Sequence, residues 1–169
     1  YYEWMMNLVE ELFESVCLSV FGNLEFTFEE KQINFNKPWK RIKYVDAIKD
    51  KTGVDVISAS ENDLKSLAKN IGIEIAGLRG KAKFVDEIFS QVVEQELIQP
   101  TFVVDYHLIL SPLAKKHRSK DGLVERFEGY IAGREICNAF SELNDPIDQR
   151  KRFEDQVKMR EAGDEEAHQ

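Results

Sequence analysis

Two glutamates in the last third of the sequence have the spacing of a cation site. Glu128 and Glu135 fall in two extended stretches joined by Ala132-Gly133. A two-residue turn there pairs Tyr130 with Glu135, which makes the two carboxylates diagonal neighbours on one face of a β-hairpin, roughly 7–8 Å apart at the backbone. Magnesium binds one or two such carboxylates together with nucleotide phosphates. The pair therefore indicates nucleotide chemistry, with two solvated surface glutamates as the simpler alternative.

Asn138, Phe140 and Glu142 alternate along the second of these stretches. Alternate residues of a strand project from one face, so this spacing brings an amide, a ring and a carboxylate together. Such a set suits a ligand with an ammonium group at the end of an apolar stem. Lysine is such a ligand, with Glu142 as its half-buried counter-charge, Phe140 against its stem and Asn138 as a polar anchor.

The two predicted sites conflict in their strand parity. Strict alternation places Glu135 on the opposite face from Asn138, Phe140 and Glu142. A β-bulge near Ile136-Cys137 inserts one extra residue and would bring all four onto one face. We therefore expect a bulge at that position.

Residues 99–154 contain several characteristic runs that resemble those of class II lysyl-tRNA synthetases, in the same order. The runs are Gln99-Pro100-Thr101-Phe102, Asp105-Tyr106, Ser111-Pro112-Leu113-Ala114-Lys115, His117-Arg118, Ala139-Phe140-Ser141-Glu142-Leu143-Asn144-Asp145-Pro146, Asp148-Gln149-Arg150 and Arg152-Phe153-Glu154. The resemblance covers essentially the whole chain and is strongest in residues 99–154.

The resemblance implies ATP-dependent activation of L-lysine to lysyl-adenylate and its transfer to tRNA(Lys), as part of a larger enzyme. Asn138, Phe140 and Glu142 match the positions that line the family's lysine pocket. Glu128 and Glu135 match its magnesium ligands, so Mg²⁺ is the implied cofactor, with ATP as co-substrate. The resemblance further implies a homodimer when the enzyme is full length, and a cytoplasmic location.

Two motifs of the family are not found in this sequence. Class II synthetases carry an ATP-binding arginine motif upstream of this region and a glycine-rich, arginine-containing motif downstream. The chain starts at Tyr1 within a helical pattern, and no stretch near residue 1 offers the upstream arginine strand. It stops at Gln169 before the downstream Gly-x-Gly-x-x-x-Arg run. We therefore expect a catalytic-domain fragment that is inactive alone.

A basic segment interrupts an otherwise acidic chain. Four of the 23 Lys and Arg residues fall within the six positions 115–120, against a net charge of −8. Lys115, His117 and Arg118 are candidates for contact with ATP phosphates or the acceptor end of tRNA, because the surrounding negative charge would direct an anion to this segment. A solvated loop is the alternative. The overall charge argues against a nucleic-acid-binding surface spread over the whole chain.

Composition is that of an ordinary globular protein, with 43% hydrophobic and 32% charged residues. Only two cysteines occur, Cys17 and Cys137, so a disulfide framework or a thiolate metal site is not expected, and two buried reduced thiols are. The sequence contains no run of roughly 18 uncharged apolar residues, so it predicts no membrane span.

Hydrophobic periodicity predicts an α+β fold. The resemblance implies that its strands belong to the antiparallel sheet of a class II synthetase catalytic domain, with an inserted helical subdomain. Residues 1–39 form one catalytic-domain part, 40–98 the helical insertion, and 99–169 the part with the pocket strands and a charged C-terminal helix. The expected strands lie within 24–35, 100–106 and 124–143. A helix over residues 2–21 carries an apolar stripe that we expect in the core; its members are Trp4, Met5, Leu8, Val9, Leu12, Phe13, Val16, Cys17 and Val20.

Two other functions remain open at this point. One is a lysyltransferase paralogue that modifies a translation factor instead of tRNA; Ser141 and the complete 40–98 segment favour the synthetase over it. The other is a non-catalytic interaction module that retains the fold. The complete set of candidate site residues argues against loss of the pocket.

Overall fold

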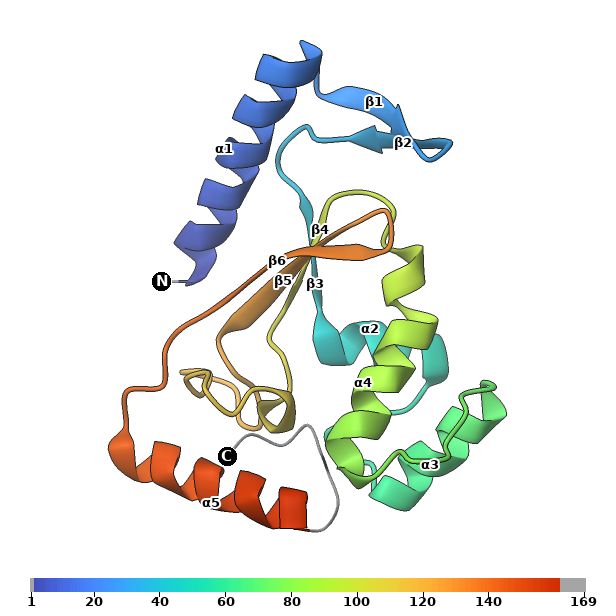
Figure 1. Cartoon of the computed structure of the whole chain (residues 1–169), viewed down its shortest axis with the longest axis vertical. Coiled ribbons are helices and arrows are strands. Elements are labelled where there is room, and N and C mark those ends of the chain that lie inside the picture. Colours follow the sequence, from blue (N-terminus) through green and yellow to red (C-terminus); the bar gives the residue numbers. More distant parts are fainter. Residues whose placement is uncertain (1, 162–169) are drawn as a thin grey trace.

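The computed structural model describes residues 2–161, which form five α-helices, six strands and two 3₁₀ turns (Figure 1). In chain order they are α1 (Tyr2–Phe21), β1 (Glu25–Phe28), β2 (Lys31–Asn34), β3 (Lys40–Lys43), α2 (Tyr44–Thr52), α3 (Glu61–Asn70), α4 (Gly80–Val92), η1 (Glu94–Glu96), β4 (Thr101–Val104), η2 (Leu108–Leu110), β5 (Arg126–Ile131), β6 (Arg134–Phe140) and α5 (Pro146–Glu161). The α+β class is confirmed.

The main sheet has four strands in the order β3-β4-β5-β6. β4 pairs antiparallel with β5, and β5 with β6, whereas β3 runs parallel to β4. A parallel pair needs a long crossover connection, and here α2, α3 and α4 provide it. The expected antiparallel strands are present, and the segment 40–43, expected to begin the helical insertion, adds a parallel strand at the edge of the sheet.

The β5–β6 hairpin has the predicted turn and register. Ala132 and Gly133 both have positive φ values, 56° and 77°, as a two-residue hairpin turn requires. Tyr130 pairs with Glu135, and Gly129 pairs with Cys137, so Ile136 is the extra residue of a bulge. The predicted β-bulge is confirmed.

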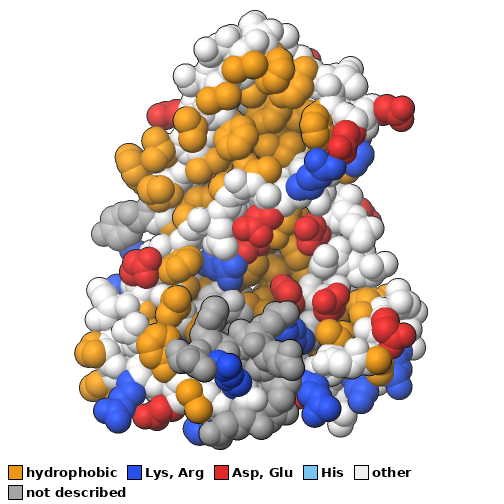
Figure 2. Space-filling model, in the orientation of Figure 1, with side chains coloured by type: hydrophobic (Ala, Val, Ile, Leu, Met, Phe, Trp, Pro, Cys, Tyr) orange, Lys and Arg blue, Asp and Glu red, His pale blue; other side chains and the backbone are white. Residues whose placement is uncertain are grey.

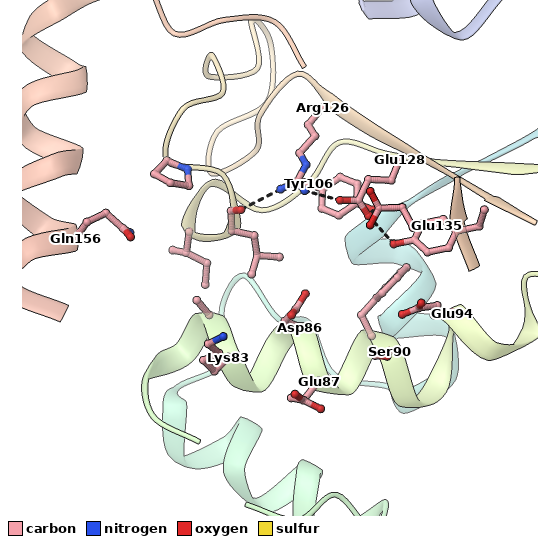
Figure 3. A pocket seen from close by; sticks show the side chains of 16 residues that line it. Lys83, Asp86, Glu87, Ser90, Glu94, Tyr106, Arg126, Glu128, Glu135 and Gln156 are labelled. Carbon is pink, nitrogen blue, oxygen red and sulfur yellow. Dashed lines mark hydrogen bonds and ion pairs between the residues drawn. The ribbon is translucent and has the colours of Figure 1, made fainter. Parts of the chain in front are cut away.

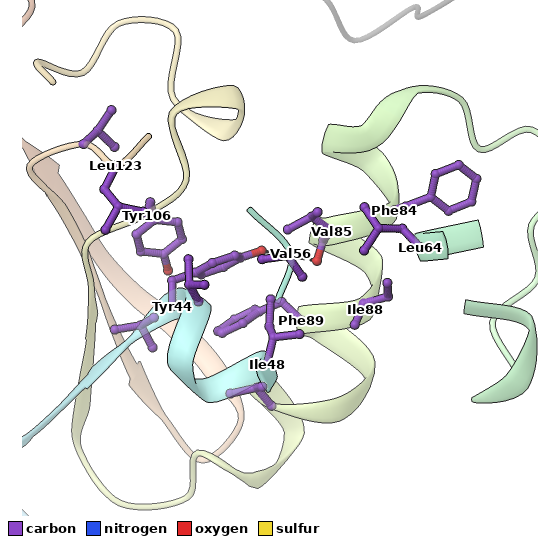
Figure 4. Packing of buried hydrophobic residues seen from close by; sticks show 14 of the residues in the cluster. Tyr44, Ile48, Val56, Leu64, Phe84, Val85, Ile88, Phe89, Tyr106 and Leu123 are labelled. Atoms are coloured by element: carbon purple, nitrogen blue, oxygen red, sulfur yellow. Dashed lines mark hydrogen bonds between the residues drawn. The ribbon is translucent and has the colours of Figure 1, made fainter. Parts of the chain in front are cut away.

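Two hydrophobic clusters lie on opposite faces of the sheet. On one face α2, α3 and α4 pack against Val103 and Tyr130, with Tyr44 stacked on Phe89 at a centroid distance of 4.4 Å (Figure 4). On the other face α1 and the β1–β2 hairpin pack against Phe102 and Phe127. Because side chains alternate along a strand, residues that share a face with Val103 point toward the helical insertion.

The apolar stripe of α1 is only partly in the core. Of the nine predicted stripe residues, Cys17 is buried and six are exposed, among them Trp4, Leu12 and Val20 at 62%, 57% and 66%. Met6, which lies outside the predicted stripe, is also buried. Figure 2 shows hydrophobic side chains gathered over the upper part of the molecule, where α1 and the β1–β2 hairpin lie. The prediction that the whole stripe is core is wrong, because α1 contacts the rest of the described chain along one side while its apolar arc extends around a second.

The remaining sequence expectations have simple outcomes. Cys17 is buried and Cys137 is half-buried, and both are free thiols. Among the helices described, none combines the length and hydrophobicity that a membrane span needs.

Candidate functional site

A cavity of about 490 Å³ lies between α4 and the face of the sheet that points toward the insertion. Asp86, Glu87 and Ser90 line it from α4, and Glu128 and Glu135 line it from the β5–β6 hairpin (Figure 3). The two candidate magnesium ligands therefore share one cavity wall. The bulge at Ile136 is what puts Glu135 on this wall, since it shifts the alternation of β6 by one residue.

Glu128 is 5% exposed and accepts hydrogen bonds from four side chains. Tyr106 donates its hydroxyl at 2.6 Å, Tyr130 and Arg126 are also donors, and the Asn138 amide donates at 3.3 Å. Burial raises the pKa of both tyrosine hydroxyls, and the Glu128 charge raises it further, so they remain proton donors. The buried carboxylate is compensated by this network.

Glu135 differs from Glu128 in its surroundings. The Glu135 carboxylate has no hydrogen bond or ion pair among residues 2–161, and the side chain is exposed where it lines the cavity. Partial burial raises its pKa, and the nearby Glu128 charge adds to this effect. A cation placed between the two carboxylates would offset that repulsion.

The donor set fits magnesium in part. Magnesium takes oxygen ligands, and Glu135 offers a carboxylate that no described group occupies. Glu128 could add a second ligand only if one of its four donors moved. No group of three or more His, Cys, Asp or Glu side chains within the described residues could hold a metal by itself. The hairpin therefore offers only part of the ligand set that a magnesium ion needs, and substrate phosphates could supply further oxygen ligands.

Arg126 connects the two candidate sites. Its guanidinium forms an ion pair with Glu128, donates to the Asn138 Oδ1 at 3.2 Å, and lies 4.7 Å from the Tyr106 ring centroid. It also donates to the Leu110 carbonyl at 3.0 Å and to the Ser111 Oγ at 2.9 Å. One cation therefore contacts a predicted magnesium ligand and a predicted lysine-pocket residue.

Sequence reasoning missed Arg126, Tyr130 and Asp86 as site residues. The signal for the first two was present, because Arg126, Glu128 and Tyr130 alternate along β5 and so share one face. Asp86 had no such signal, since its place in the cavity depends on how α4 packs on the sheet.

Two of the three predicted lysine-pocket residues, Asn138 and Phe140, lie on β6, and Glu142 follows two residues after its end. Asn138 pairs with Glu128 across the hairpin and Phe140 pairs with Arg126, so both share the face of the cavity. Phe140 packs against the cluster of the helical insertion. Glu142 follows β6 and bridges to Ala114, and its side chain is exposed rather than half-buried as predicted. The described part of the chain contributes no element that would cover it.

The basic segment makes mostly internal contacts. Arg118 donates to both carboxylate oxygens of Glu125, at 2.5 and 3.1 Å, and Ser141 donates to the same carboxylate at 2.8 Å. His117 is mostly buried, with its Nε2 3.6 Å from Asp105 Oδ1. Lys115 is exposed. Contact of Lys115, His117 and Arg118 with phosphate or tRNA remains a prediction, for which only Lys115 has a readily available charge.

Comparison with known proteins identifies the family of the chain. The whole chain, residues 1–169, matches the family described as tRNA synthetases class II (D, K and N). It is 45% identical over 166 residues to the "Lysine--tRNA ligase" of Porphyromonas gingivalis and 49% identical over 166 residues to that of Christiangramia forsetii. Each alignment covers 98% of this chain and 29% of the relative, so the chain spans under a third of their length.

Proposed function

The chain belongs to the class II tRNA synthetases (D, K and N), and on that premise we propose that it forms part of an enzyme that activates L-lysine with ATP and transfers it to tRNA(Lys). The observation that carries the proposal is the β5–β6 hairpin, where the bulge puts Glu135 on the same face as Glu128, Asn138 and Phe140. The names of the relatives, lysine–tRNA ligases at 45% and 49% identity, support lysine as the amino acid.

Formation of an aminoacyl-adenylate requires positioning and charge stabilisation. The carboxylate of the amino acid attacks the α-phosphate of ATP, and pyrophosphate leaves. Charge develops on phosphate oxygens, so the enzyme gains rate by fixing cationic groups beside them. Bound Mg²⁺ supplies part of that positive charge, and Glu128 and Glu135 would hold it.

Lysine recognition is assigned to the C-terminal end of β6 and the residues that follow it. Glu142 would pair with the side-chain ammonium, Phe140 would contact the methylene stem, and Asn138 would anchor a polar group. Arg126 compensates the Glu128 charge, whereas Glu142 is exposed and could pair with a substrate ammonium group. These roles are proposals that the hairpin geometry supports.

The proposal includes partners beyond the described residues. L-Lysine, ATP and tRNA(Lys) are the substrates, the full-length enzyme is a homodimer, and it acts in the cytoplasm. The chain spans 29% of its relatives, so activity is assigned to the full-length enzyme and not to this chain alone.

Lysine-dependent ATP–pyrophosphate exchange by the full-length enzyme tests the function. The unsubstituted enzyme is expected to exchange with lysine and not with arginine or ornithine at equal concentration. Glu142→Gln removes the counter-charge, so KM for lysine should rise on the order of 100-fold, as expected when a charged pair loses one partner. A Glu142→Gln enzyme with normal lysine selectivity would defeat the pocket assignment.

A matched variant tests the specificity of that effect. Glu154 is another exposed glutamate, on α5, where it pairs with Arg150 along the helix. Glu154→Gln should leave KM for lysine within twofold of the unsubstituted enzyme. If the two variants behave alike, a general loss of negative charge explains the result and the pocket role fails.

A further inference from the structure

Arg152 is a buried arginine on α5, the helix that lines the candidate cavity through Gln156. It is 9% exposed, whereas its neighbour Arg150 on the same helix has a side chain that is 83% exposed. Burying a guanidinium is costly unless its donors are paired. The contacts of Arg152 therefore indicate what it stabilises.

The guanidinium of Arg152 connects α5 to the segment after η2. Its Nε and Nη2 donate to the two carboxylate oxygens of Asp148, at 3.2 and 2.8 Å. Its Nη1 donates to the backbone carbonyls of Ser111 at 3.2 Å and Ala114 at 2.7 Å. The two hydrogen bonds to Asp148 hold the Arg152 side chain in one orientation, because the planar guanidinium matches the geometry of the carboxylate. Arg152 lowers the pKa of Asp148 to about 2, which keeps the carboxylate charged.

Each of the two carbonyls leads to a different end of the candidate site. Ser111 accepts a hydrogen bond from Arg126 at its Oγ, and Arg126 in turn forms the ion pair with Glu128. The first path thus runs from α5 to a predicted magnesium ligand through two side chains.

The second path runs to the predicted lysine counter-charge. Ala114 bridges antiparallel to Glu142, flanked by hydrogen bonds from Lys115 N–H to the Ser141 carbonyl at 2.8 Å and from Leu143 N–H to the Leu113 carbonyl at 3.0 Å. The backbone on both sides of Glu142 is therefore hydrogen-bonded to residues 113–115, next to the Ala114 carbonyl that accepts from Arg152.

We propose that Arg152 is a positioning residue that aligns both ends of the substrate site, Glu128 through Ser111 and Arg126, and Glu142 through Ala114. In this proposal Arg152 contacts neither L-lysine nor ATP, and it acts through the 111–114 segment. Displacing reactive groups by about 1 Å is enough to lower rates on the order of 100-fold, so a distant clamp of this kind affects catalysis. The inference rests on the proposed function, because it assigns roles in that same site.

The test compares Arg152→Lys with Arg150→Lys in the full-length enzyme. The lysine side chain at position 152 keeps the positive charge. It cannot form two parallel hydrogen bonds with Asp148 and also donate to the carbonyls of Ser111 and Ala114. The expected result for Arg152→Lys is a rise on the order of 10-fold in KM for lysine and in the Mg²⁺ concentration that gives half-maximal pyrophosphate exchange. Arg150→Lys should change neither by more than twofold.

Two further results separate positioning from a general folding role. If Arg152 only stabilised the fold, Arg152→Lys would lower the amount of active enzyme and its melting temperature, with KM for lysine unchanged, and the proposal would be overturned. Asp148→Asn removes the partner that orients Arg152, and should raise KM for lysine in the same direction as Arg152→Lys.

A crystal structure of the Arg152→Lys enzyme provides a readout that does not depend on activity. The expected change is a displaced 111–114 segment with the contact from Arg126 to Ser111 lost. An unchanged segment would overturn the positioning role. Absence of lysine-dependent exchange in the unsubstituted enzyme would instead count against the proposed function, and the structural comparison would still decide the role of Arg152.

Discussion

At the scale of single residues, buried carboxylates are compensated by specific cations, and Glu125 gives a measurable case. Arg118 is the main cause that lowers the pKa of Glu125 to about 2, from a usual value of 4.5. A lowered folded-state pKa means that the stabilisation is complete above pH 4.5 and is lost as the pH falls toward 2. Arg118→Met should therefore lower the free energy of unfolding by about 1–2 kcal/mol at pH 7, a figure reduced from that of a fully buried pair because Arg118 is half exposed.

Chemical unfolding of the chain over a pH series measures this effect. The difference between Arg118→Met and the unsubstituted chain should shrink between pH 4.5 and pH 2, because Glu125 becomes protonated in both. Arg150→Met, at an exposed pair, should cost less than about 0.5 kcal/mol at every pH. An Arg118→Met penalty that does not vary with pH would contradict the ion-pair explanation.

At the scale of elements, the β5–β6 hairpin depends on a close approach at Gly129. A Cβ at this position would lie 2.6 Å from the Cys137 Sγ and 3.3 Å from the Ile136 Cδ1. Gly129→Ala should therefore destabilise the chain by about 1–3 kcal/mol and disturb the bulge that places Glu135. Combining it with Cys137→Ala removes the nearest atom, so the double variant should be more stable than the sum of the two single penalties predicts. Additive penalties in unfolding experiments would show that the strain lies elsewhere.

At the scale of the whole molecule, the sheet separates two hydrophobic clusters. In the cluster around Phe102 and Phe127, α1 is buried along only one of its sides. Met6 is 2% exposed and Leu12 is 57% exposed, although both belong to the apolar surface of the same helix. Met6→Ala should cost about 2–3 kcal/mol in the unfolding of this chain, and Leu12→Ala less than about 0.5 kcal/mol. Equal penalties would mean that the outer side of α1 is also buried when the chain is in solution.

Much of the candidate site could be predicted from the sequence because it lies on one hairpin. The turn at Ala132-Gly133, the register and the bulge all follow from local rules of strand alternation and turn chemistry. The same rules, applied to β5, would have identified Arg126. Asp86 and Arg152 could not be found in this way, because their positions depend on how α4 and α5 pack on segments distant in the sequence.

The sequence by itself therefore determined the hairpin, most of the helices and the family, all of which are encoded in short-range periodicity or in characteristic runs. Only the tertiary structure decided that residues 40–43 form a strand parallel to β4, that six of the nine predicted stripe residues of α1 are exposed, and that Glu142 is open to solvent. The physical reason is common to all three. Periodicity indicates whether a segment is helical or extended and which of its sides is apolar. Strand pairing and burial depend on which other element packs against that segment.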